Sequence, residues 1–112
     1  MTDPAYPAHR EFQVATICGS MRYYDRMLKV AQVHTAAGAV VLMPFVAVAA
    51  ADQGDDHKAM LDRMHRQKID MADLVIIVTD PETQYVGEST RAEIEYAQAS
   101  GKPVQWQLEP TS

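Results

Sequence analysis

Short apolar runs alternate with amphipathic stretches along this chain. The clearest run is Val75 to Val78, in which four β-branched residues follow one another without a polar interruption. A run of this kind is typical of a strand that is buried on both faces of a parallel sheet. Similar runs predict three further strands, at Phe12–Cys18, Val40–Met43 and Pro103–Gln107.

Helical periodicity predicts three helices between these strands. The first follows a tight turn at Gly19–Arg22 and runs to about Ala37. We expect Asp55 or Asp56 to cap the second helix, and Gly101 to end the third. The residues expected to face inward are Tyr24, Met27, Leu28, Ala31 and Thr35 on the first helix, and Met60, Leu61, Met64 and Met71 on the second.

Strands that alternate with helices predict an α/β fold with a parallel sheet, joined by right-handed crossovers. We expect a small flavodoxin-like or Rossmann-like three-layer sandwich with the strand order 2-1-3-4. In that order the winding reverses between the first and third strands, and ligands bind at the carboxyl ends of those strands. The loops that this topology brings together are Gly19–Arg22 and Asp80–Thr90.

Residues 1–112 are expected to form one domain, with residues 1–11 and 109–112 as loose tails. The connection from Phe45 to Asp56 is long for so small a domain. It could serve as a lid over a site, or residues 46–51 could form extra helix or pack on a partner subunit. The sequence does not separate these alternatives.

The net charge of −5 argues against a nucleic acid polymer as partner, because a phosphate-backbone binder carries a basic face. Cys18 is the only cysteine, so no disulfide can form within the chain, and its place in an apolar run indicates a buried, inert thiol. We find neither a signal peptide nor a stretch long enough to span a bilayer. The expectation is a cytoplasmic protein without a membrane partner.

Several common sites are excluded by their missing residues. The five glycines are too scattered for a G-x-G-x-x-G or Walker loop, and Gly87-Glu88-Ser89 lacks the second glycine of a nucleophile elbow. A phosphoacceptor role for Asp80 would need an acidic pair after the first strand, where the chain reads CGSMR. His57 and His65 have no cysteine neighbours in sequence and no HExxH frame, so neither a metal nor a cofactor is predicted.

The residues that remain suit an anion cradle. Gly19 permits close backbone approach, Ser20 offers a hydroxyl, and Arg22 can bind a phosphate or carboxylate through two hydrogen bonds. Ser89 and Thr90 add hydroxyls from the facing loop, unless they only cap the helix.

Glu93 has two readings. Thr90-Arg91-Ala92-Glu93 fits a capping box, in which Thr90 would be the N-cap and Glu93 would bond back to it. Alternatively, Glu93 is a functional carboxylate beside the anion cradle. The local pattern alone favours the capping box.

Three motifs resemble the nucleoside 2-deoxyribosyltransferase superfamily, including its small 2'-deoxynucleoside 5'-phosphate N-hydrolases. They are ICGSMR at residues 17–22, HRQKIDMAD at residues 65–73, and YVGESTRAEIEYA at residues 85–97 followed by GKPV. The resemblance runs from about Val14 to Trp106, and the third motif is the most specific. The chain looks most similar to a short branch of the superfamily that is often left as a domain of unknown function.

The resemblance implies that Glu93 attacks C1' of the sugar and displaces the base. It also implies that Gly19, Ser20, the Met21 backbone and Arg22 bind a 5'-phosphate. His65 stands where the transferases carry an acidic residue, and Gly87 stands where their glutamate loop begins with a polar one, so both positions are taken as substrate contacts.

Protonation of the leaving nucleobase adds two candidate catalytic residues. Cleavage of an N-glycosidic bond passes through an oxocarbenium-like state that a carboxylate stabilises. The leaving base needs a proton, for which Asp80 and Glu88 are the candidates in the loop. We therefore predict N-glycosidic cleavage or transfer on a nucleoside or nucleoside 5'-monophosphate.

A non-catalytic nucleotide-binding module is the alternative prediction, and an interaction domain with incidental pockets is a third. We also expect a homodimer or larger assembly, because a domain of this size leaves its pocket half open and because the superfamily resemblance implies it. A monomer with full ligand affinity at high concentration would contradict that expectation.

Overall fold

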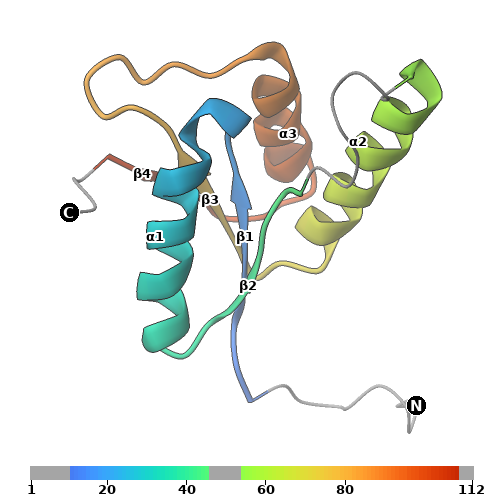
Figure 1. Cartoon of the computed structure of the whole chain (residues 1–112). Helices are drawn as coiled ribbons and strands as arrows, with labels where there is room; N and C mark the ends of the chain where they lie inside the picture. Colours follow the sequence, from blue (N-terminus) through green and yellow to red (C-terminus); the bar gives the residue numbers. More distant parts are fainter. Residues whose placement is uncertain (1–10, 46–53, 109–112) are drawn as a thin grey trace, which may run out of the picture.

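The computed structural model describes residues 11–45 and 54–108. These residues form a four-stranded, all-parallel sheet in the order β2-β1-β3-β4 (Figure 1). The strands are β1 (Val14–Cys18), β2 (Val40–Leu42), β3 (Leu74–Val78) and β4 (Val104–Gln107). The predicted α/β fold and its strand order are confirmed.

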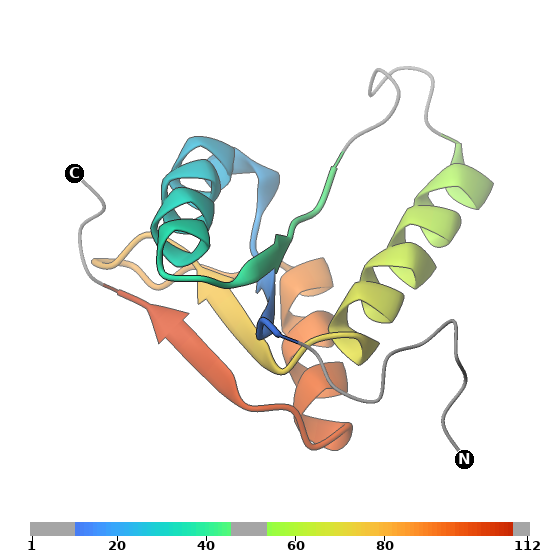
Figure 2. The ribbon, with the colours of Figure 1, turned by 90° about the horizontal axis from the view of Figure 1, so that it is seen from below.

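The helices form the outer layers of the sandwich. They are the short 3-10 helix η1 (Met21–Tyr23), α1 (Tyr24–Ala36), α2 (Asp55–Asp70) and α3 (Glu88–Ala99). Figure 2 shows α1 on one face of the sheet, with α2 and α3 together on the other. The three-layer arrangement therefore holds as predicted.

Alternate residues of β1 and β3 supply the two halves of the core. Ile17 and Val78 pack toward α1, where they meet Met27 and Val30. Cys18 faces the opposite layer, with Ile69 of α2 and Ala97 of α3. Because successive side chains of a strand point to opposite faces, the last residue of β1 is placed in the α2–α3 layer.

The predicted inward face of α1 is only partly right. Met27 and Val30 are its buried residues, whereas Leu28 is 40% exposed and Thr35 lies at the surface. The side chains of α1 that meet the core are Met27 and Val30, with Tyr24 and Ala31 packed against them and partly buried.

The predicted inward face of α2 is mostly wrong. Met60, Met64 and Met71 are between 39% and 50% exposed, while His65 and Ile69 are buried. His65 and Ile69 are four residues apart and so share one face, and the sheet packs on that face. The prediction is wrong because methionine is more hydrophobic than histidine, so the hydrophobic pattern assigned the methionine side of α2 to the core.

Some predictions concern segments outside the described residues. They are the tails at residues 1–10 and 109–112, and residues 46–53 of the long connection. The capping prediction for α2 is wrong, because Gly54 is the N-cap and no side chain caps the helix. Within residues 11–45 and 54–108, no helix combines the length and the apolar character that a bilayer crossing requires.

A close backbone approach holds the β1–η1 turn against the end of β3. A Cβ atom placed on Gly19 would lie 2.5 Å from the carbonyl oxygen of Val78. No side chain fits there without moving one of the two backbones. Gly19 therefore fixes how closely the first turn sits to the loop that follows β3.

We predict that Gly19→Ala lowers the free energy of unfolding by about 1–3 kcal/mol, the usual cost of overpacking. Gly54→Ala is the control for an added methyl without a clash, since a Cβ there meets nothing within 4 Å and its cost is confined to the lower preference for alanine at an N-cap. Urea unfolding of both variants measures the difference. Equal stabilities would show that the contact with Val78 is not restrictive.

Candidate active site

Three elements bring polar side chains together at the carboxyl end of β1. Cys18 is the last residue of β1, His65 lies on the sheet-facing side of α2, and Glu93 lies on the second turn of α3. Each occupies a position that the fold turns inward, so the convergence follows from the packing of α2 and α3 on the sheet. These three residues are here called the Cys18–His65–Glu93 cluster.

One imidazole nitrogen faces both of the other side chains in the cluster. His65 Nε2 lies 3.3 Å from Cys18 Sγ and 3.7 Å from Glu93 Oε1. The other ring nitrogen, Nδ1, is buried and has no hydrogen-bond partner among the described residues. The contacts to Cys18 and Glu93 are therefore the ones that orient the ring.

Burial disfavours charge on all three side chains of the cluster. It raises the pKa of Glu93 to about 7 and lowers the pKa of His65 to about 4, in the latter case helped by the nearby charge of Lys68. Burial also raises the pKa of the Cys18 thiol well above its usual range, and Glu93 adds to the shift. Near neutral pH, His65 and Glu93 are thus in contact without forming an ion pair.

A cavity of about 590 Å³ opens over this cluster. His65 and Glu93 line it, together with Gly19, Ser20 and Met21 of the first turn. The start of α3 forms another part of its lining, through Gly87, Glu88, Ser89 and Thr90. A volume of this size is in the range of small-molecule sites. The two loops that the topology was predicted to bring together do meet at this cavity.

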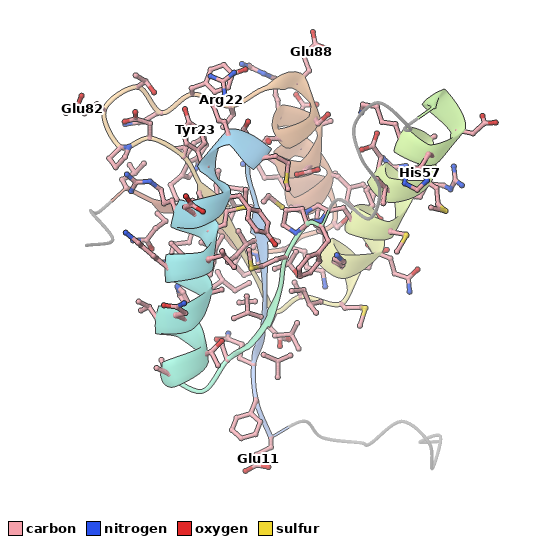
Figure 3. The ribbon with its side chains drawn as sticks, viewed as in Figure 1. Glu11, Arg22, Tyr23, His57, Glu82 and Glu88 are labelled. Carbon is pink, nitrogen blue, oxygen red and sulfur yellow. The ribbon has the colours of Figure 1, made fainter. Side chains whose placement is uncertain are left out.

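Two residues named from the sequence lie outside the cavity lining. The Arg22 guanidinium stacks 4.3 Å from the centre of the Tyr85 ring. Asp80 shapes its own loop, because its carboxylate accepts a hydrogen bond from the Glu82 backbone N–H at 2.8 Å. Figure 3 shows Arg22 and Glu88 at the carboxyl edge of the sheet, with Glu11 at the opposite edge.

The capping box predicted for α3 is wrong. The helix begins at Glu88, its N-cap is Gly87, and no side chain caps it. Thr90 is already inside the first turn and is buried. Glu93 therefore does not bond back to a Thr90 cap. Its carboxylate is instead 18% exposed and faces His65.

The sequence interpretation did not find several residues of the cavity. They are Pro44, Phe45, Lys58, Leu61, Asp62, Met64 and Lys68. Most come from α2, where the chain carries no recognisable motif before His65. Helical spacing is the signal that could have identified three of them. Lys68, Leu61 and Lys58 lie three, four and seven residues from His65, on the same side of a helix.

Comparison with known proteins gives a structural match. Residues spanning 84% of this chain superpose on 63% of a 2-desoxiribosyltransferase from Leishmania mexicana, with a TM-score of 0.64 and 19% sequence identity. No family model and no curated protein sequence matches the chain.

The chain has a nucleoside 2-deoxyribosyltransferase-like fold. It spans less than two thirds of the length of the Leishmania protein. At this level of identity the match establishes the fold, and the roles of individual residues must come from the geometry of the cavity.

The raised pKa of Glu93 in this deoxyribosyltransferase-like fold predicts a loss of stability as the pH rises. An unperturbed carboxyl of this type titrates near 4.5, and Glu93 in the folded chain titrates near 7. The folded state therefore holds an extra proton between these values, and the free energy of unfolding falls as the pH rises through them.

We predict that Glu93→Gln removes this fall, so that its stability relative to the wild type improves by up to about 3 kcal/mol between about pH 4 and pH 8. Urea unfolding in a chelator-containing buffer measures it. His65 titrates in both proteins, so its contribution largely cancels in the difference. Glu95→Gln, at an exposed position of α3, is the control. A stability difference that does not change with pH would contradict the prediction.

Proposed function

We propose that this protein cleaves or transfers the N-glycosidic bond of a nucleoside or nucleoside 5'-monophosphate, with Glu93 as the nucleophile. The observation that carries the proposal is the position of Glu93. Its partly buried carboxylate lines the 590 Å³ cavity between the Gly19–Met21 turn and the start of α3. The deoxyribosyltransferase-like fold is consistent with a nucleoside as the small-molecule partner.

The reaction has two displacements. A Glu93 carboxylate oxygen bonds to C1' of the sugar while the bond from C1' to the base nitrogen breaks, and the bonding electron pair leaves with the base. Attack by water on the glycosyl ester then releases the sugar and restores Glu93. A second base in place of water gives transfer. The oxocarbenium character at C1' is stabilised by the same carboxylate.

Glu88 is the better placed of the two proposed proton donors for the leaving base. It lines the cavity, whereas the Asp80 carboxylate lies outside the lining and is engaged by the Glu82 backbone. His65 serves as a positioning residue in this scheme, because its Nε2 is next to Glu93 Oε1. The proton reaches the base from Glu88 or from solvent at the cavity mouth.

The sugar and its phosphate would lie along the other side of the cavity. The start of α3 presents backbone N–H groups there, a favourable place for an anion. The Gly19–Met21 turn supplies backbone and the Ser20 hydroxyl. Lys58 brings an ammonium group to the start of α3, where its Nζ lies 3.5 Å from Ser89 Oγ. A phosphate there would compete with Asp62, whose Oδ2 lies 3.1 Å from the same Nζ. Arg22, stacked on Tyr85, would need to swing away from that ring to contribute.

A non-catalytic nucleotide-binding module is the second candidate. The observation that favours it is the placement of the proton donors, because Asp80 is outside the cavity and Glu88 is an exposed residue at its edge. A site that only binds would use Glu93 to hold a sugar hydroxyl.

We predict that the wild-type protein releases free base from at least one member of a panel of ribo- and deoxyribonucleosides and their 5'-monophosphates. Chromatography of the free base measures it. Glu93→Gln should lower the rate by at least about 10³-fold, since it removes the nucleophile and keeps the shape of the side chain. Glu95→Gln, on the exposed face of α3, is the matched control and should keep the rate.

The same panel separates the two candidate functions. Melting temperatures are measured with each compound. A nucleotide that raises the melting temperature of both the wild type and Glu93→Gln, without release of base, would replace the glycosidase by the binding module. No release and no thermal shift would contradict both functions.

A second prediction concerns the phosphate. Lys58→Met should raise the KM for a 5'-monophosphate by about tenfold and leave the KM for the matching nucleoside unchanged, because one charge-assisted contact is worth about 1.5 kcal/mol. Arg63→Met removes a cation from the same helix outside the cavity lining and is the control. Equal effects of Lys58→Met on both compounds would place the phosphate elsewhere.

The proposal includes a homodimer or larger assembly in the cytoplasm. Phe45 and Met64 line the cavity yet are 61% and 50% exposed. Apolar side chains at the rim of a site are places where a second subunit could close it.

A further inference from the structure

We propose that the Cys18–His65–Glu93 cluster binds a divalent metal ion of the zinc type. The ion would be held by Cys18 Sγ, His65 Nε2 and one carboxylate oxygen of Glu93. This goes beyond the glycosidase proposal and does not depend on it, since it concerns what the three side chains bind and not whether a nucleoside is cleaved.

The distances fit a single ion. All three donor atoms lie within 4.8 Å of one another. Bond lengths to zinc of about 2.0–2.3 Å in a tetrahedral arrangement put neighbouring ligand atoms about 3.3–3.6 Å apart. The Sγ–Nε2 distance is 3.3 Å and the Nε2–Oε1 distance is 3.7 Å. The remaining pair of donor atoms, on Cys18 and Glu93, lies within the same 4.8 Å limit.

The arrangement is convergent, which distinguishes it from a proton relay. In a Cys–His–acid triad the thiol contacts one ring nitrogen and the carboxylate contacts the other. Here both contact Nε2, and Nδ1 has no hydrogen-bond partner among the described residues. Cys18 is also completely buried, so it cannot reach a substrate as a nucleophile. Three donors that point to one place are the geometry of a ligand set.

The chemistry of the donors agrees with the geometry. Thiolate, imidazole and carboxylate are the three side-chain types that bind zinc. A thiolate and a carboxylate together carry two negative charges, which a divalent cation neutralises within a largely buried site. Without the ion, burial favours the protonated forms of the same two groups. Binding therefore exchanges protons for one metal ion.

One coordination position would remain open toward the cavity. His65 and Glu93 line the cavity, whereas Cys18 lies behind them and does not. A fourth, exchangeable ligand such as water would thus approach from the cavity side. An ion on Glu93 would also withdraw its carboxylate from attack on a sugar, so the metal-bound and nucleophilic states exclude each other.

Cobalt(II) tests the proposal, because its spectrum reports the ligands directly. We expect the metal-free chain of residues 1–112 to bind one Co²⁺, with the near-ultraviolet charge-transfer absorption of a thiolate ligand and the strong visible absorption of tetrahedral cobalt. Zn²⁺ should displace the cobalt. Cys18→Ala should abolish the charge-transfer band, and Glu93→Gln should weaken Co²⁺ binding by at least about 100-fold.

The controls keep the test decisive. His57→Ala removes a histidine from the same helix, outside the cavity lining, and should bind Co²⁺ as the wild type does. Circular dichroism verifies that each variant is folded. If Cys18→Ala does not fold, the Co²⁺ affinity of Glu93→Gln tests the proposal in its place. The proposal is overturned if wild type binds no stoichiometric cobalt, if the complex lacks the thiolate band, or if His57→Ala loses binding and Glu93→Gln does not.

Discussion

The burial of β3 on both faces is the constraint on which the rest of the structure depends. Val75, Ile76, Ile77 and Val78 are all completely buried. A strand without an exposed face needs helices on both sides of its sheet, and right-handed crossovers provide them only if the winding reverses beside it. That reversal lies between β1 and β3. It sends α1 to one face and α2 and α3 to the other, and leaves the cavity at the carboxyl edge of the reversal.

The same burial sets the chemistry of the cavity. Cys18 and Ile77 are register partners and enter the α2–α3 layer together. Cys18 is thereby enclosed behind His65 and Glu93, and all three side chains lose most of the water that would solvate their charged forms. Desolvation is the largest cause of the raised pKa of Glu93 and of the lowered pKa of His65. Because ionising these buried groups costs free energy, their anionic forms would be stabilised by a cation in the cavity. The oxocarbenium-like state of a substrate or a metal cation would be such a partner.

The sequence predicted the fold well because strand burial and crossover handedness are local or general properties. It also brought the Gly19 turn and the start of α3 together, through topology alone. It did worse where tertiary packing decides. The exposed Met60 and Met64 show that α2 is rotated from the face its hydrophobicity suggests. Cys18 and His65 are 47 positions apart in the sequence, and only the packing of α2 on β1 puts their side chains 3.3 Å apart.

The role of Glu93 could not be assigned from the local sequence pattern around it. The spacing from Thr90 matched a capping box, yet Gly87 begins the helix and leaves the carboxylate uncommitted to the backbone. A carboxylate with no capping role, next to His65 and open to a cavity, suits either the proposed attack on a sugar or the proposed metal ligation, but not both at once. Burial disfavours the ionised form of Glu93, and both roles require that form. The partner that supplies compensating positive charge in the cavity therefore decides which role is expressed.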